Sequence, residues 1–229
     1  MVGRLFAVLA LLVGMGVAAP AAAAEAKPGG FVVRLGKNLS LDGREFRYAG
    51  TNNYYLMYKS QLMVDDVFAD AQAAGFTVLR TWGFLDIGNA DGSDSIRGKS
   101  DGVYFQYWDG DSPAHNDGAD GLQRLDYVLA SARRHGIKLV IPLTNNWNDF
   151  GGMDQYVRWK GGQYHDEFYT DPLIRTWYKA WIAHVLERVN VLSGVAYKDD
   201  ATILAWELAN EPRCRAYGVY PESGTCTTD

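Results

Sequence analysis

The chain has 229 residues, which is enough for one sizeable hydrophobic core but not for two. Its formal net charge of -5 excludes a strongly basic surface for nucleic acid. Aromatic residues make up 13% of the chain, including 7 Trp and 14 Tyr. Because aromatic rings pack well against the C–H faces of sugars, this composition leans weakly toward a carbohydrate ligand.

Residues 1–24 have the pattern of a secretory signal peptide. Arg4 supplies a basic start, residues 5–17 are apolar, and residues 19–24 are small. The apolar run is too short to span a bilayer comfortably. We therefore expect cleavage near Ala24, an extracellular protein with no membrane attachment after cleavage, and a folded domain over residues 25–229.

Secretion also permits disulfide bonds. Cys214 and Cys226 are the two cysteines of the chain, and both follow Glu211 in an expected loop. A bridge within this loop is the favoured interpretation, with free thiols as the alternative.

The mature chain alternates between strand-like and helix-like apolar patterns. A hairpin over residues 31–41 is expected to cap the bottom of the fold. Four strands are then expected at 46–51, 76–82, 137–143 and 203–211, separated by helices at 64–74, 122–132 and 171–189. This order predicts an α/β fold with a parallel sheet, and polar groups at the strand ends favour a (β/α)8 TIM barrel. Only about the first four βα units of such a barrel are present.

Two long connections are expected to be polar loops at the top of the barrel, over residues 83–118 and 149–170. Four aspartates of the first loop do not fit the spacing of a calcium-binding EF-hand, so a solvated loop is favoured. Trp177 and Trp181, on the apolar face of the third helix with Val189, are expected in the core.

The stretch 203–213 places Asn210 and Glu211 at the end of the fourth strand, and Pro212 closes the strand because proline cannot donate to a ladder. Glu211 is either a catalytic carboxylate or a solvated turn residue. Arg80, a charge within a strand of buried type, either extends to the rim or holds a catalytic carboxylate ionised. The residue pattern leaves both questions open.

Five segments, 80–84, 144–152, 168–172, 194–200 and 206–214, give the chain a family resemblance. From about Phe31 onward the sequence resembles secreted β-mannanases of glycoside hydrolase family 5. Asn-Glu-Pro is widespread among related glycosidases and implies only the reaction class. The longer string Trp-Glu-Leu-Ala-Asn-Glu-Pro-Arg-Cys and the Asn-Asn-Trp block at 145–147 are more specific to the mannanase branch.

The resemblance implies a retaining hydrolase of β-1,4-mannan that needs no metal or cofactor and is a monomer at full length. It assigns Glu211 as the general acid/base, Asn210 as the ligand of the sugar 2-hydroxyl, and Arg80 as the support of the nucleophile. Four further residues are implied in the substrate cleft: Trp82, Asn145, Trp147 and Arg213, the last near the +2 position.

The nucleophilic glutamate of this family lies on the seventh strand, which this chain does not reach. Glu207 is not expected to replace it, because four residues of strand separate it from Glu211 by roughly 13 Å. Two alternatives remain: another family-5 glycanase, such as a cellulase or exo-β-mannosidase, or a non-catalytic carbohydrate-binding fragment. Assays on mannan and carboxymethylcellulose, with binding to insoluble mannan, separate the three.

We predict that the purified 229-residue chain alone releases no reducing ends from mannan, because retaining hydrolysis needs two carboxyl groups about 5–5.5 Å apart. A reducing-end assay beside the full-length protein checks this. Turnover with retention by the chain alone would contradict it.

Overall fold

A computed structural model describes residues 30–216 and 218–224. The predicted signal peptide and Cys226 lie outside these residues and remain predictions. The central feature is a parallel sheet in the order β10-β9-β5-β4. Its strands are β4 (Gly50–Asn52), β5 (Val78–Arg80), β9 (Lys138–Pro142) and β10 (Ile203–Glu207). The four expected strands and their parallel pairing are confirmed.

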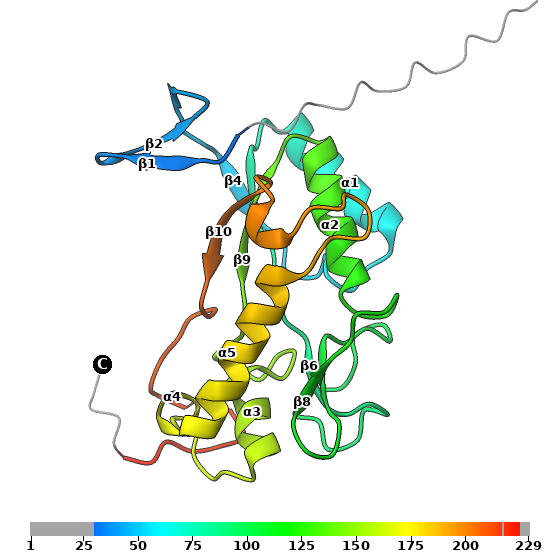
Figure 1. The fold of residues 1–229 in the computed structure, drawn as a ribbon, viewed down its shortest axis with the longest axis vertical. Helices are drawn as coiled ribbons and strands as arrows, with labels where there is room; N and C mark the ends of the chain where they lie inside the picture. The colour runs from blue at the N-terminus through cyan, green and yellow to red at the C-terminus, as the bar shows by residue number, and fades with distance from the viewer. Residues whose placement is uncertain (1–29, 217, 225–229) are drawn as a thin grey trace, which may run out of the picture.

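The three expected helices connect these strands, and α1 and α2 cover one face of the sheet (Figure 1). They are α1 (Gln61–Ala73), α2 (Gln123–Arg134) and α5 (Pro172–Glu187). Gly75 and Gly136 follow α1 and α2 with φ of +78° and +68°, the left-handed backbone that ends a helix. The Asp171 carboxylate caps α5 by accepting from the N–H groups of Leu173 and Ile174.

Strand β10 is shorter than expected, because it ends at Glu207 and not at Glu211. Glu207 pairs with Pro142, and its carbonyl oxygen accepts the last bond of the strand from Leu143 N at 3.0 Å. Leu208 is then 69% exposed, and Glu211 has a left-handed backbone with φ of +47°.

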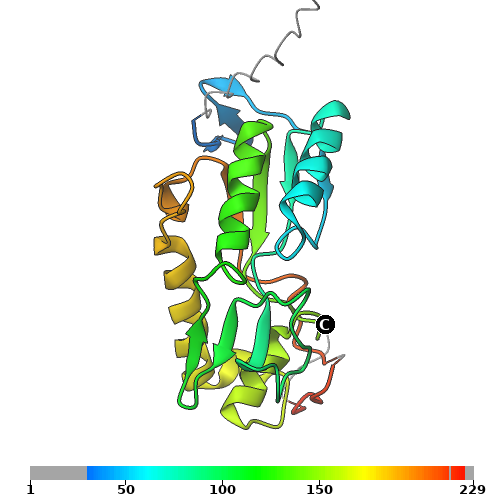
Figure 2. The ribbon, with the colours of Figure 1, turned by 90° about the vertical axis from the view of Figure 1, so that its right-hand side faces the viewer.

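The prediction of a solvated loop over residues 83–118 is wrong. This segment forms a second sheet below the first (Figure 2), from β6 (Asp86–Asn89), β7 (Gln106–Trp108) and β8 (Pro113–His115). Its apolar side chains Leu85, Ile87, Val103 and Phe105 are buried in the main core. These runs are only a few residues long among Gly and Asp, so they carry no strand periodicity of their own.

The second expected loop, 149–170, is also wrong, since it contains two helices. These are α3 (Gly152–Lys160) and the short α4 (Glu167–Thr170). With α5 they form a smaller core of Met153, Tyr156, Val157, Trp159, Phe168 and Ile174. Glycines at 151, 152 and 161 frame α3 and made the segment resemble a loop.

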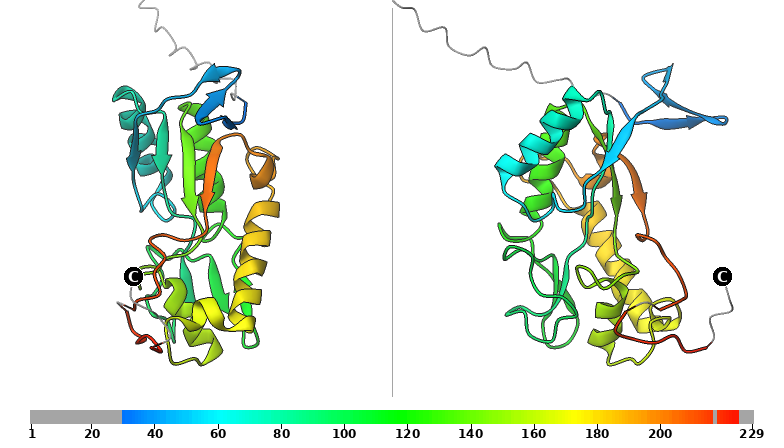
Figure 3. Two further views of the ribbon diagram at one scale, coloured as in Figure 1. Left: turned by 90° about the vertical axis from the view of Figure 1, so that its left-hand side faces the viewer. Right: turned by 180° about the vertical axis from the view of Figure 1, so that it is seen from behind.

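The N-terminal hairpin is confirmed, with one strand more than expected. Strands β1 (Val33–Leu35), β2 (Asn38–Leu41) and β3 (Arg44–Glu45) form an antiparallel sheet at the N-terminal end of the parallel strands (Figure 3). It lies at the opposite end of the parallel sheet from the chain that follows β10.

Helix α5 buries the side chains that were expected in the core, with one exception. Trp181 is fully buried and its Nε1 donates to Leu143 O at 2.9 Å. Trp177 is partly buried and packs edge-on against Trp108. Val189 is 56% exposed, because α5 ends two residues before it at Glu187.

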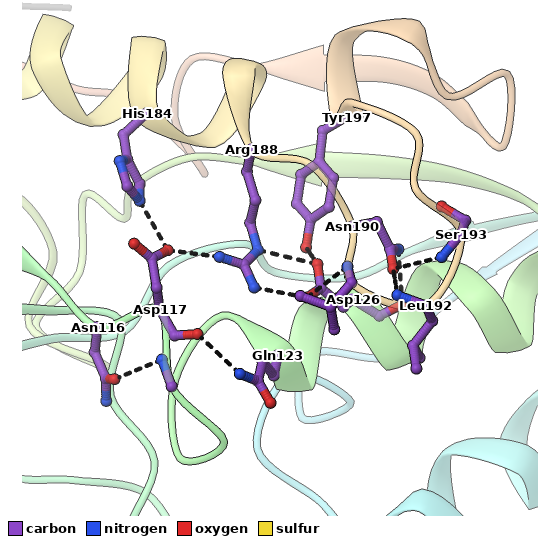
Figure 4. A network of polar contacts seen from close by, with 12 residues as sticks. Asn116, Asp117, Gln123, Asp126, His184, Arg188, Asn190, Leu192, Ser193 and Tyr197 are labelled. Carbon is purple, nitrogen blue, oxygen red and sulfur yellow. Dashed lines mark hydrogen bonds and ion pairs between the residues drawn. The ribbon is translucent and has the colours of Figure 1, made fainter.

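A buried ion pair ties α2 to the chain that follows α5 (Figure 4). The Arg188 guanidinium donates through Nε and Nη2 to both oxygens of Asp126, at 3.0 and 2.6 Å. The Tyr197 hydroxyl, from the 3-10 turn Tyr197–Asp199, donates to the same carboxylate at 2.6 Å. The Asp126 side chain is fully buried. The cost of burying its negative charge is offset by the Arg188 guanidinium and by these hydrogen bonds.

No helix among the described residues is long and apolar enough to cross a bilayer.

A second buried carboxylate, Asp86, has no cation among its hydrogen-bonding partners. Its Oδ1 accepts from Gln106 Nε2 at 2.7 Å, and the backbone of Gly152 also bonds the carboxylate. Burial raises the pKa of Asp86 to about 8, because these hydrogen bonds offset only part of the cost of desolvating the charge.

We predict that Asp86→Asn removes a pH dependence of stability. The folded state holds the Asp86 proton up to about pH 8, so this stabilisation is complete below the unfolded pKa near 3.8, declines as pH rises above that value, and is fully lost once pH has risen through 8. Between the unfolded pKa near 3.8 and the folded pKa of about 8 the wild type should lose about 1.4 kcal/mol per pH unit, roughly 3–6 °C in Tm, and above pH 8 this loss should stop. Thermal unfolding between about pH 5 and pH 9.5 checks both the decline and its end.

The control is Asp66→Asn, which alters an exposed carboxylate of α1. It should keep the wild-type decline. Parallel Tm curves for wild type and Asp86→Asn would contradict the prediction.

Candidate active site

The carboxyl ends of β5, β9 and β10 meet at one edge of the parallel sheet. Arg80 is the last residue of β5 and Glu207 the last of β10, while Asn145 follows β9. Since neighbouring parallel strands end side by side, these three side chains are brought together from distant parts of the sequence.

Arg80 binds three groups at this edge, of which the weakest contact is from its Nη1 to Asn52 Oδ1 at 3.4 Å. Its Nε and Nη2 donate to Glu207 Oε2 at 2.9 and 2.6 Å, and Nη2 also donates to Asn210 Oδ1 at 2.8 Å. Of the two interpretations of Arg80, pairing with a carboxylate is therefore the one observed. The carboxylate is Glu207, so within this chain the guanidinium engages a residue that the sequence did not indicate.

The chain from Glu207 to Glu211 is not one strand, so the separation of roughly 13 Å expected from strand rise does not apply to these two residues. What distinguishes Glu207 is that its Oε2 accepts two hydrogen bonds from Arg80, and the side chains of this pair are 28% (Arg80) and 36% (Glu207) exposed.

Asn210 has a fixed orientation. It is 5% exposed, its Oδ1 faces Arg80, and its Nδ2 donates to Asn145 Oδ1 at 2.9 Å. Asn145 is 1% exposed and donates in turn to Asp149 O at 3.0 Å. Asn145 therefore positions Asn210, and its expected direct contact with substrate stays a prediction.

Glu211 lies directly beyond Asn210, with its side chain about half exposed. Trp147 Nε1 donates to Glu211 Oε2 at 2.9 Å, and Arg213 Nη2 lies 3.6 Å from the same oxygen. The Arg213 guanidinium also stands over the Trp147 ring, 5.7 Å from its centroid. Two of the predicted residues, Trp147 and Arg213, thus surround the carboxylate of a third, Glu211.

The backbone around Glu211 is held on both sides by Asn146. Asn146 N donates to Asn210 O at 3.0 Å, and Asn146 Oδ1 accepts from Arg213 N at 3.0 Å. A left-handed glutamate costs about 1–2 kcal/mol relative to the usual conformation, so it persists only where its surroundings require it. Asn146 belongs to the Asn-Asn-Trp block at 145–147, and no pattern in the sequence indicates its contacts around Glu211.

Trp82 lies apart from these two hydrogen-bonded groups. It packs in an aromatic cluster with Tyr54, Phe84 and Phe150, with ring centroids 5.2–5.5 Å from its own. Of these rings, Tyr54 is 44% exposed and reaches the surface.

Next to the residues that follow Glu211 the surface is hollowed, with a cavity of about 380 Å³. Its lining residues are Asp166, Tyr169, Thr170, Pro212, Arg213 and Cys214. Cys214 is disulfide-bonded, as expected. The predicted partner Cys226 lies outside the described residues.

In the part of the chain that the structure describes, no group of three or more His, Cys, Asp or Glu side chains is placed to hold a metal ion.

Comparison with known proteins gives one consistent result. A family model described as "GH family 5 beta-mannosidase-like" matches residues 29–222. Mannan endo-1,4-beta-mannosidase F of Aspergillus clavatus is 42% identical over 205 residues, covering 88% of this chain and 41% of that protein. The probable mannan endo-1,4-beta-mannosidase A of Aspergillus flavus is 41% identical over 199 residues, covering 86% and 47%.

Among solved structures, the endo-1,4-beta-mannanase of Rhizomucor miehei matches with a TM-score of 0.78 and 46% identity. The match covers 86% of this chain and 53% of that one. The chain therefore spans about half the length of the relatives it matches. Its parallel sheet and helices are part of a (β/α)8 barrel, about the first four βα units.

We predict that Arg80→Lys lowers the free energy of unfolding by about 1–2 kcal/mol, because one ammonium cannot reproduce the forked contact with Glu207 and Asn210. Urea unfolding measures it. Arg134→Lys is the matched control at an exposed pair with Asp65 and should cost under about 0.5 kcal/mol. Equal losses of unfolding free energy in Arg80→Lys and Arg134→Lys would show that the forked contact of Arg80 adds no stability beyond that of an exposed ion pair.

Proposed function

Because the chain belongs to glycoside hydrolase family 5, in its β-mannosidase-like group, we propose that the whole protein is an endo-β-1,4-mannanase. Its substrates are mannan, glucomannan and galactomannan, cut with retention of configuration. The observation that carries the proposal is Glu211, held at the carboxyl end of β10 between Trp147 and Arg213 and next to the oriented Asn210. Identities of 41–46% to mannan endo-mannosidases and mannanases support the choice of glycan.

Glu211 acts as general acid and then as general base. It protonates the glycosidic oxygen as the bond to the leaving sugar breaks, and the resulting carboxylate later takes a proton from the attacking water. Trp147 fixes the position of the carboxyl group through one oxygen, at 2.9 Å. Substrate binding covers the half-exposed side chain and excludes water from it.

Asn210 contacts the sugar 2-hydroxyl, a hydrogen bond that strengthens in the transition state. Arg80 and Asn145 hold the Asn210 amide from two sides, so little reorganisation is required when the sugar binds. Arg80 also retains its proposed role next to the nucleophile, since its guanidinium lies at the edge where strand ends converge.

Three side chains line the cleft in this proposal. Trp82 offers an aromatic face on one side of Glu211, and Trp147 lies at the scissile bond. Arg213 borders the hollow at Pro212 and Cys214, which we assign to the leaving-group side near +2. The second carboxylate comes from the region of the relatives that this chain does not cover.

In this proposal the whole protein is secreted, as the pattern of residues 1–24 indicates, and it works as a monomer on polysaccharide without a metal or cofactor.

We predict that Glu211→Gln in the full-length protein lowers kcat on mannan by about 10²–10⁴-fold, because the amide can neither give nor take the proton. Release of reducing ends from mannan and from carboxymethylcellulose measures rate and glycan preference together.

The control is Glu187→Gln, at a surface pair between α5 and Lys198, which should leave turnover unchanged. Full activity of the Glu211→Gln protein would exclude the acid/base role, and a faster rate on carboxymethylcellulose would exclude mannan as the preferred substrate.

A further inference from the structure

A buried histidine lies behind the segment that carries Glu211. His165, in the connection between α3 and α4, is 1% exposed. Its Nδ1 lies 2.7 Å from Asp154 Oδ1 and its Nε2 lies 3.2 Å from Asn146 Oδ1. The ring therefore bridges a carboxylate of α3 and the residue that brackets Glu211.

The neighbours of Asn146 determine how its amide is oriented. The backbone N–H of Arg213 donates to Asn146 Oδ1, which places the oxygen, and not the NH₂ group, on this side. His165 Nε2 meets the same oxygen, so both ring nitrogens face acceptors.

Asp154 is a rigid support for this ring. Its side chain is fully buried, and its second oxygen accepts from Val219 N at 2.9 Å. The residue belongs to α3, which packs in the smaller core with α4 and α5. The backbone of His165 is fixed as well, because its N–H donates to Pro221 O at 2.9 Å.

The contacts of Asn146 fix the backbone at Glu211. Asn146 holds Asn210 through its backbone and Arg213 through its side chain, and only Glu211 and Pro212 lie between the two contacts. The left-handed backbone of Glu211 is confined between them. If the Asn146 amide rotates, the Arg213 contact is lost, and the carboxyl group can move.

We propose that His165 is a positioning residue for the general acid/base. By holding the Asn146 carboxamide, with Asp154 behind it, His165 fixes the backbone from Asn210 to Arg213 and so places the Glu211 carboxyl group. The proposal rests on the function proposed above for Glu211.

Two substitutions of one side chain test it, made in the full-length protein. In His165→Gln the amide nitrogen takes the place of Nε2 and keeps the contact with Asn146. In His165→Asn it takes the place of Nδ1 and keeps only the contact with Asp154. We expect His165→Asn to lose on the order of tenfold or more in kcat on mannan with KM nearly unchanged, and His165→Gln to stay within about threefold of wild type.

A second measurement tests whether the loss of kcat in His165→Asn results from a displaced Glu211 carboxyl group. A dinitrophenyl β-mannobioside needs no acid to release its phenolate, and azide needs no base to attack the glycosyl-enzyme. The attack forms the C1–N bond, breaks the bond between C1 and the nucleophile, and gives the β-mannosyl azide. Azide should therefore restore turnover of His165→Asn on this substrate. Equal losses in both variants, or a loss that azide does not restore, would overturn the proposal.

Amide hydrogen exchange keeps the test independent of the proposed reaction. The Arg213 N–H should exchange at least about tenfold faster in His165→Asn than in His165→Gln, because only the first variant frees the Asn146 amide. If the wild type does not act on mannan, the proposed function fails, and the exchange result still decides whether His165 fixes this backbone. Equal exchange in the two variants would show that it does not.

The matched control is His135→Asn. His135 ends α2 near the opposite end of the sheet, where its Nδ1 contacts Ser131 O and its ring stacks on Phe68. This substitution should alter neither turnover nor exchange at Arg213. A similar loss in it would mean that the His165 effect is general destabilisation, which would overturn the proposal.

Discussion

The parallel register of β5, β9 and β10 is the constraint on which the site depends. Arg80 is aligned with Val140 of β9, and β9 is aligned in turn with β10, so the three strands end at one edge. A shift of any strand by one residue would turn Arg80 or Glu207 to the other face of the sheet. The Arg80 contacts with Glu207 and Asn210 therefore report the register directly.

A second layer of structure supports the segment that leaves this edge. The chain turns from extended to left-handed at Glu211, and it does so over helix α3 and the connection to α4, not over solvent. The buried acceptors on Asn146 and Asp154 take the N–H groups of Arg213 and Val219. Because these N–H groups lie outside any strand or helix, the supporting side chains supply the hydrogen bonds that the parallel ladder provides only as far as Asn210.

The elements of the fold that depend on neighbouring residues could be predicted from the sequence. Strand positions, the glycines that end α1 and α2, and the Asp171 cap depend on neighbours a few residues apart. The sheet of β6, β7 and β8 could not be predicted, because its strands of three or four residues are stabilised by burial in the main core. The partner of Arg80 is 127 residues away, and the left-handed Glu211 depends on Asn146, so no local pattern indicated either.

The central claim is that the backbone geometry at Asn210 and Glu211 presents a general acid to a glycosidic bond. The most direct measurement is a crystal structure of the full-length Glu211→Gln protein with mannopentaose. The account predicts a glycosidic oxygen within about 3 Å of the residue-211 amide, with the 2-hydroxyl of the adjoining sugar on Asn210. A mannopentaose chain that crosses the protein away from residue 211 would contradict it.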